Sequence, residues 1–139
     1  MTKSEENKKI VLDILQDEIK GDVQSALNKM HEKYSMTWVY KSKTELFPTT
    51  SKNLKDELEE VYKIENREYK IKHILADDDT VMVEMIESYT DPNDGKTYRT
   101  PEVIVLEIKD GKIITGRHYC DPQISHLNLS ESEIGKIYK

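Results

Sequence analysis

The sequence predicts an α+β domain in which N-terminal helices pack against an antiparallel sheet. Near the N-terminus, apolar residues recur about every 3.6 positions, whereas from residue 69 onward they alternate with polar residues at a spacing of two. Helices followed by strands with short turns favour antiparallel pairing over a doubly wound parallel fold. Because 139 residues suffice for one hydrophobic core, residues 1–139 are expected to form a single domain.

Two helices are predicted before residue 31. The first carries an apolar stripe made of Ile10, Val11, Ile14, Leu15 and Ile19. Thr2 and Glu5 have the spacing of a capping box, and Gly21 is a suitable C-terminal stop. Asp22 then predicts the start of a shorter helix. Its apolar residues are Val23, Ala26, Leu27 and Met30.

A strand and a third helix follow. Residues 34–40 are predicted as a strand whose one face consists of Tyr34, Met36, Trp38 and Tyr40. Residues 41–52, interrupted by Pro48, are predicted as a loop. Asn53 is a candidate cap for the third helix, whose apolar residues are Leu54, Leu58, Val61 and Tyr62.

The second half of the chain predicts a meander of strands. The first of them shows an apolar face made of Tyr69, Ile71, His73 and Leu75. Three more are expected at about 80–89, 97–109 and 112–120, the last two joined by the hairpin dipeptide Asp110-Gly111. A short helix is expected to follow Ser130.

The predicted hairpin also sets a register and suggests a partner. If Lys109 faces Lys112, then His118 lies beside Val103, and Gly116 lies beside Val105. Both faces of these last strands are apolar, so both require cover. The helices can cover one face, and a homodimer through the sheet is the simplest way to cover the other.

Composition narrows the possible partners and the cellular compartment. The net charge is −6 and no basic stripe occurs, which argues against nucleic-acid binding. The longest apolar run is four residues, at 103–106, which argues against a membrane span. A polar N-terminus and the single cysteine, Cys120, fit a cytoplasmic protein without an internal disulfide.

Three segments carry a resemblance to a known family. They are Gly21-Asp22, the hairpin Asp110-Gly111-Lys112-Ile113, and Arg117-His118-Tyr119-Cys120-Asp121. With this order of elements, the chain resembles the SnoaL-like branch of the nuclear-transport-factor-2-like superfamily. That branch includes polyketide cyclases, limonene-epoxide-hydrolase-like and ketosteroid-isomerase-like proteins. The resemblance implies a cone-shaped curved sheet around a pocket for a small hydrophobic molecule, while it specifies the activity poorly.

The catalytic residues of the resembled enzymes are not all present. The Asp-Arg-Asp set of the epoxide hydrolases would fall on Met85 for the arginine, and on Glu87 and His118 for the aspartates. The missing arginine argues against that chemistry. The aspartate base of the steroid isomerases would fall within residues 37–39, which contain no carboxylate.

His118 and Glu87 are the candidate catalytic residues. An imidazole can exchange protons near neutral pH, and a carboxylate alternating with Val83 and Met85 is expected to be partly buried. If the two side chains meet, one can orient the other as acid or base. The alternatives are a histidine satisfied by hydrogen bonds in the core and a glutamate at the rim that faces water.

The ligand-binding candidates are Tyr34, Trp38, His73 and Met85, for which simple core packing is the alternative. No cofactor and no metal are expected, because the four histidines are scattered and Cys120 has no partner cysteine. Three functions stay open at this stage. One is a proton-transfer isomerase or cyclase acting on a hydrophobic substrate, another is a non-catalytic carrier or sensor, and the third is a dimeric scaffold with a vestigial pocket.

Overall fold

The computed structural model describes residues 1–42, 45–48 and 54–139. In chain order its elements are α1 (Lys3–Lys20), α2 (Val23–Asn28), β1 (Met30–Ser42), β2 (Glu45–Pro48), α3 (Leu54–Tyr62), β3 (Glu68–Asp77), β4 (Thr80–Thr90), β5 (Thr97–Lys109), β6 (Lys112–Cys120), α4 (Pro122–His126) and α5 (Glu131–Ile137). The predicted α+β class is confirmed. Among the described residues, no helix is long and apolar enough to cross a membrane.

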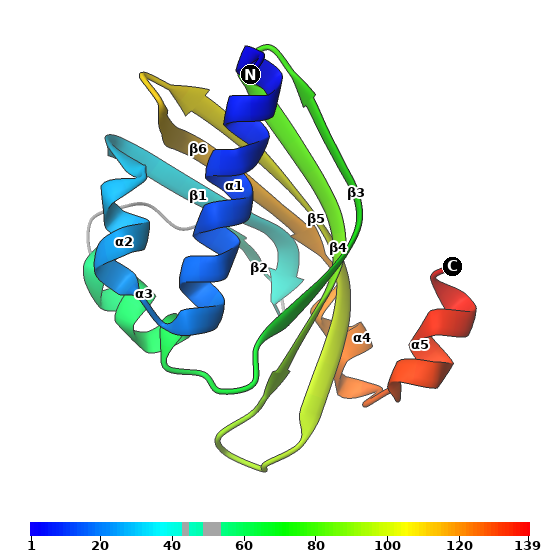
Figure 1. The fold of residues 1–139 in the computed structure, drawn as a ribbon. Coiled ribbons are helices and arrows are strands. Elements are labelled where there is room, and N and C mark those ends of the chain that lie inside the picture. The colour runs from blue at the N-terminus through cyan, green and yellow to red at the C-terminus, as the bar shows by residue number, and fades with distance from the viewer. Residues whose placement is uncertain (43–44, 49–53) are drawn as a thin grey trace.

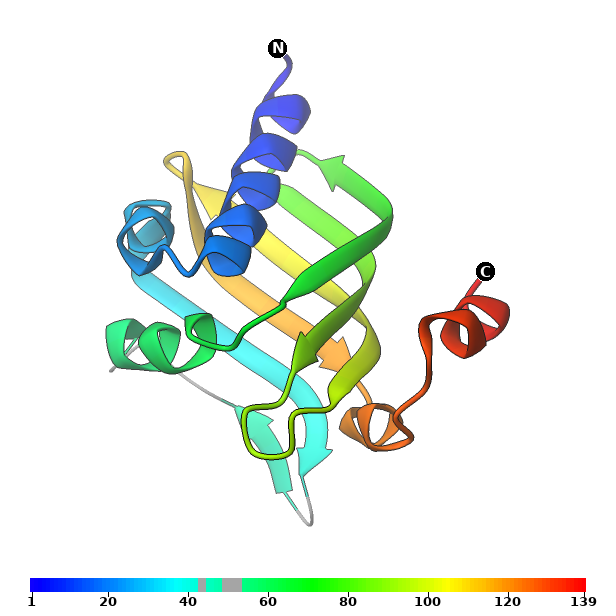
Figure 2. The same cartoon turned by 60° about the horizontal axis from the view of Figure 1, so that its bottom comes forward.

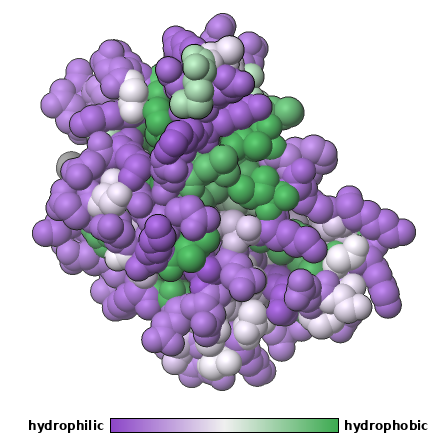
Figure 3. Space-filling view, viewed as in Figure 1, coloured by the Kyte–Doolittle hydropathy of each residue, from purple (hydrophilic) through white to green (hydrophobic). Residues whose placement is uncertain are grey.

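Six strands form one curved sheet, with the helices divided between its two sides. The spatial order of the strands is β2-β1-β6-β5-β4-β3. Helices α1, α2 and α3 lie over one face, whereas α4 and α5 lie on the opposite side (Figures 1 and 2). The surface of the molecule on the side of α1 is mostly hydrophilic. Apolar side chains are visible on this surface beside α1, where the helix crosses the sheet (Figure 3).

The sheet is mixed, which corrects the prediction of a wholly antiparallel one. The meander β3-β4-β5-β6 is antiparallel as expected, but β1 pairs with β6 in parallel. The chain leaves β1, passes through α3 and enters the sheet again at its far edge with β3. The last strand of the meander therefore reaches β1 running in the same direction.

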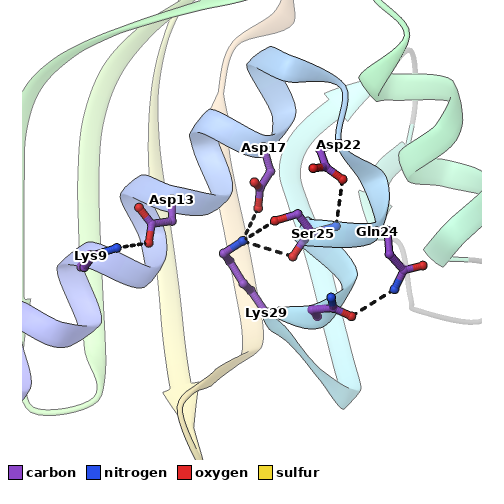
Figure 4. Close-up of polar contacts among 8 residues, drawn as sticks. Lys9, Asp13, Asp17, Asp22, Gln24, Ser25 and Lys29 are labelled. Atoms are coloured by element: carbon purple, nitrogen blue, oxygen red, sulfur yellow. Dashed lines mark hydrogen bonds and ion pairs between the residues drawn. The ribbon is translucent and has the colours of Figure 1, made fainter.

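The caps that begin and end the first helices are confirmed. Thr2 and Glu5 form the capping box of α1, and Gly21 ends the helix in the left-handed conformation at φ 72°. The Asp22 side chain accepts a hydrogen bond from the Ser25 amide at 3.1 Å and so caps α2. Lys29 Nζ lies 2.6 Å from Asp17 Oδ2 and joins the two helices (Figure 4).

Other boundaries differ from the predictions. The first strand is longer than expected, and the short β2 lies in the segment predicted as a loop. Helix α3 forms as predicted, although its candidate cap Asn53 lies outside the described residues. Helix α4 was not predicted. It begins after Asp121, whose side chain accepts a hydrogen bond from the Gln123 amide.

Two β-bulges change which side chains face the helices. Lys109 faces Lys112 as predicted, but an irregularity at Glu107 and Ile108 then shifts the register, so His118 lies opposite Ile104 rather than Val103. The same shift places Gly116 opposite Leu106 rather than Val105. The predicted register assumed regular pairing along the whole hairpin. A bulge shifts the register beyond it by one residue.

The second bulge lies in β3, between Ile71 and His73. Beyond it the alternation reverses, so that Ile74 packs against the core and Leu75 is 63% exposed. The predicted apolar face of this strand is therefore wrong for His73 and Leu75.

Candidate functional site

A cavity of about 290 Å³ lies between the sheet and helices α1 and α3. Most of its wall is apolar or aromatic, as in most small-molecule sites. The apolar part consists of Ile14, Leu15, Met30, Met36, Leu54, Leu58, Val61, Ile64, Met85, Ile104, Leu106 and Ile113. The aromatic part consists of Tyr34, Trp38, Tyr62, Tyr69 and Tyr89.

Most of the residues predicted from sequence lie at this cavity. His118, Glu87, Tyr34, Trp38 and Met85 all line it. Their strands, β1, β4 and β6, turn the same face toward the helices, so the period-two pattern was sufficient to bring these side chains together.

His73 is the exception. Its side chain is 73% exposed on the outer face of the sheet, where its Nδ1 lies 2.8 Å from Glu84 Oε1. It is absent from the cavity wall. The bulge between Ile71 and His73 is the cause, because the extra residue turns the histidine to the other face.

His118 is paired with Glu102, a residue that the sequence reasoning missed. Nε2 of His118 lies 2.6 Å from Oε2 of Glu102, and the two side chains are 17% and 2% exposed. Glu102 lies opposite Cys120 on the neighbouring strand, and so it is diagonal to His118 on the same face. The signal for Glu102 was available, since it is in phase with Ile104 and Leu106 along its strand.

The environment shifts the protonation of this pair. Burial and the nearby negative charge of Glu87 raise the pKa of Glu102 to about 7, although the hydrogen bond to His118 opposes the shift. Burial lowers the pKa of His118, but hydrogen bonds to Cys120 and Glu102 outweigh it and raise the pKa to about 10. His118 is therefore an imidazolium at neutral pH.

Glu87 lines the cavity but contacts Arg67 rather than His118, so the conditional pairing of Glu87 with His118 does not form. Its Oε2 accepts a hydrogen bond from Nη1 of Arg67 at 2.8 Å. Glu102 lies between the two predicted residues, because β5 separates β4 from β6. Arg67, in the segment between α3 and β3, was missed because it belongs to no periodic pattern.

Arg67 also contacts three other groups around the cavity. Its Nη2 donates to the Val61 carbonyl at 3.2 Å, and its guanidinium lies 5.3 Å from the centre of the Tyr89 ring. Its Nε lies 3.4 Å from Oε1 of Glu18 on α1. Burial opposes the charge of Arg67, yet the carboxylates of Glu87 and Glu18 raise its pKa.

Glu18 is the third residue that sequence reasoning missed. Burial, followed by repulsion from Glu87, raises its pKa to about 7, while Arg67, Tyr69 and His118 partly offset the shift. Its position four residues after Ile14 continues the apolar stripe of α1, which was an available sign that it faces the core.

In the part of the chain that the structure describes, no group of three or more histidine, cysteine, aspartate or glutamate side chains is arranged to hold a metal ion. The expectation that the protein uses neither metal nor cofactor stays a prediction.

Comparison with known proteins now places the chain in a family. The SnoaL-like domain family matches residues 14–115, which is most of the chain. This protein belongs to the SnoaL-like family. No curated protein sequence matches it closely enough to count as a relative.

Solved structures share the fold of this SnoaL-like protein. An LEH-like epoxide hydrolase of M. tuberculosis has a TM-score of 0.73 at 17% identity, over 98% of this chain and 97% of that chain. SalBIII, an epoxide hydrolase/cyclase-like enzyme in pyran ring formation of the polyether salinomycin, has a TM-score of 0.68 at 19% identity, over 84% and 91%.

A de novo designed protein with a curved β-sheet also matches, with a TM-score of 0.61 at 17% identity over 99% of both chains. Identities this low establish the shared architecture alone. Function has to be argued from the residues of the cavity.

Proposed function

We propose that this SnoaL-like protein is an isomerase- or cyclase-type enzyme that moves a proton on a small hydrophobic substrate bound in the cavity. The observation that carries the proposal is the buried pair of His118 and Glu102 in an otherwise largely apolar cavity. Ionisable groups whose protonation is shifted by burial and by a specific partner are concentrated at functional sites.

His118 is the proposed acid and Glu87 the proposed base. Nε2 of His118 is held by Glu102, so the proton that the imidazolium gives to a substrate oxygen is that of the other ring nitrogen, Nδ1, in exchange for the interaction with Cys120. Across β5, Nη1 of Arg67 lies 2.8 Å from Oε2 of Glu87 and orients this carboxylate. Both His118 and Glu87 line the cavity, where a substrate can reach them.

The relatives support this class of chemistry without specifying the substrate. The solved structures that share its fold include an LEH-like epoxide hydrolase and an epoxide hydrolase/cyclase-like enzyme in pyran ring formation. Met85 stands where the sequence resemblance places an arginine, and the guanidinium of Arg67 reaches the neighbouring carboxylate from another segment. The arrangement of charged groups in this site therefore differs from the Asp-Arg-Asp set of the resembled epoxide hydrolases, and the activity has to be tested directly.

The test is deuterium exchange into a hydrophobic ketone. In D₂O, we expect the protein to accelerate exchange at the carbon next to the carbonyl of 1-tetralone, as measured by mass spectrometry. H118Q and E87Q should each reduce the acceleration by about 10²-fold or more, the usual contribution of a positioned acid or base. The controls H73Q and E84Q alter the exposed histidine–glutamate pair and should change it by less than about twofold.

Exchange that persists in H118Q would contradict the proposal. Binding of 1-tetralone without accelerated exchange would instead favour a non-catalytic carrier or sensor. The specific observation in favour of a carrier is the large apolar and aromatic share of the cavity wall.

We also propose that the protein acts in the cytoplasm as a homodimer that associates through the outer face of its sheet. Leu75, Met82 and Tyr119 support this, since they are 63%, 47% and 42% exposed. Light scattering at micromolar concentration should give twice the mass of the chain, and M82K should shift the protein toward the monomer. A wild-type mass equal to that of one chain would exclude the dimer.

A further inference from the structure

The described wall of the cavity carries more acidic than basic side chains. Its charged residues are Glu18, Glu57, Glu87, Glu102, Arg67 and His118. Both cations are already in contact with a carboxylate, at 2.8 Å for Arg67 with Glu87 and 2.6 Å for His118 with Glu102. The described lining is therefore net acidic when its carboxylates are ionised.

Glu18 lies where the backbone adds further negative potential. It belongs to the last turn of α1, and the C-terminus of a helix carries a partial negative charge. The C-terminus of α3 is adjacent, because a Cβ placed on Gly21 would lie 3.1 Å from the Tyr62 carbonyl oxygen. Two helix ends and one carboxylate therefore converge at this end of the cavity.

Arg67 compensates this negative potential only in part. Its Nε is 3.4 Å from Glu18 but is not aligned for a hydrogen bond, and it is the buried side-chain atom without a hydrogen-bond partner among the described residues. The Arg67 side chain is 4% exposed, and its better contact is with Glu87. The guanidinium of Arg67 is thus shared by two carboxylates and interacts more closely with Glu87 than with Glu18.

Aromatic rings surround the same carboxylate. Tyr69 lines the cavity with Glu18 and is close enough to lower the pKa of that carboxyl. Burial raises the pKa of both Tyr34 and Tyr62, and the negative charge of Glu18 adds to the rise in each case, so both phenols lie near this carboxylate. Aromatic faces beside an anion form a favourable environment for an organic cation.

We propose that the cavity binds hydrophobic organic cations, with a protonated amine beside Glu18 and the apolar body against the aromatic and aliphatic wall. This inference depends on one part of the proposed function, namely that the cavity binds a ligand. It does not depend on proton transfer by His118 and Glu87.

Binding of such a cation should depend on pH. The pKa of Glu18 is raised to about 7, so a bound ammonium group is expected to favour the ionised form and release a proton to solvent. His118 keeps its charge through this range because its pKa is raised to about 10. The other titratable or charged groups around Glu18 and the neighbouring phenols are Tyr34, Glu57, Tyr62, Arg67, Tyr69, Glu87 and Glu102.

The experiment compares three probes that share one skeleton, namely 4-phenylbutylamine, 4-phenylbutanol and 4-phenylbutyrate. By calorimetry at about pH 8, where Glu18 is mostly ionised, the amine should bind at least about tenfold more tightly than the alcohol, and the carboxylate most weakly. The affinity of the amine should rise between about pH 6 and pH 8, with proton release visible as a dependence of the heat on the buffer.

E18Q should remove the preference for the amine, because it should weaken the amine at least about tenfold more than the alcohol. E84Q, which removes an exposed carboxylate from the outer face, should keep the preference. Glu102 lines the same cavity and its pKa is also raised to about 7, so, should E18Q fail to fold, the amine is measured with E102Q instead. Proton release that persists in E102Q assigns the ionisation to Glu18, and its loss there overturns the inference.

The inference is overturned if the alcohol or the carboxylate binds as tightly as the amine, if E18Q weakens all three probes equally, or if the amine does not bind at millimolar concentration. If the protein binds the amine but does not exchange deuterium into ketones, the proposed catalysis is refuted and the proposed cation specificity stands. If it exchanges deuterium but does not prefer the amine, the catalysis stands and the cation specificity is refuted.

Discussion

Two histidine–glutamate pairs among the residues that the structure describes, one on each face of the sheet, have similar geometry in different surroundings. His118 and Glu102 approach to 2.6 Å on the inner face, where their side chains are 17% and 2% exposed. His73 and Glu84 approach to 2.8 Å on the outer face, where the values are 73% and 51%. The distances differ little, whereas access to water differs greatly.

That difference determines what each pair can do. At the inner face, low solvent access and the neighbouring Glu87 make the charged form of Glu102 costly, which raises its pKa to about 7. At the outer face, water reaches both His73 and Glu84, so solvent and salt weaken the interaction between them. The comparison teaches that a histidine and a glutamate in contact are a candidate site only where the protein excludes water from them.

The largest expected effect is a dependence of stability on pH that comes from the inner pair. A carboxyl whose pKa is raised from 4.5 to about 7 on folding contributes stability below about pH 4.5, and that contribution is lost as the pH rises toward 7. His118, with its pKa raised to about 10, adds stability below about pH 6.5 that is lost toward pH 10. The pair therefore makes the protein less stable as the pH rises.

Urea denaturation between about pH 5 and pH 8 measures this effect. For E102Q, we expect the fall in unfolding free energy over this range to be smaller than in the wild type by on the order of 3 kcal/mol, the equivalent of the shift of Glu102. E84Q, the matched change in the outer pair, should follow the wild-type curve. Parallel curves for E102Q and the wild type would show that burial does not distinguish the two pairs.

The elements could be predicted because their signals are local. The capping box at Thr2 and Glu5, the stop at Gly21 and the turn at Asp110-Gly111 each involve a few consecutive residues, and all three are present in the structure. At the hairpin, Asp110 and Gly111 have φ values of 53° and 73°, the conformation that Asp-Gly favours. Local chemistry was sufficient at these positions.

The site was predicted only in part because its pairing depends on register. The bulge at Glu107 and Ile108 places His118 opposite Ile104, and so brings Glu102 within reach. The bulge in β3 turns His73 to the outer face. A bulge places one extra residue in one strand of a pair and bends that strand. The alternation of residues along a single strand therefore does not reveal where a bulge lies.

Glu18 and Arg67 were missed for a related reason. Each comes from an element outside the meander, and their contact depends on how α1 and the segment before β3 pack against the sheet. Charged residues are mostly exposed in proteins, which favoured a surface position for both, although the place of Glu18 in the apolar stripe of α1 indicated the core. Both side chains are buried because they line the cavity, and the cavity forms only when the helices pack against the sheet.

The smallest expected effect is at the outer pair. At a concentration where light scattering gives the mass of a single chain, so that the proposed dimer does not cover the outer face, replacing Glu84 with alanine should lower the unfolding free energy by less than about 1 kcal/mol, because exposed polar pairs gain little and are screened by salt. The measurement is urea denaturation of wild type and E84A at low and at high salt, where the small difference should shrink further as salt is added. A loss well above 1 kcal/mol that resists salt would mean that Glu84 is shielded from water in solution. The contrast between the two pairs in access to water would then be refuted.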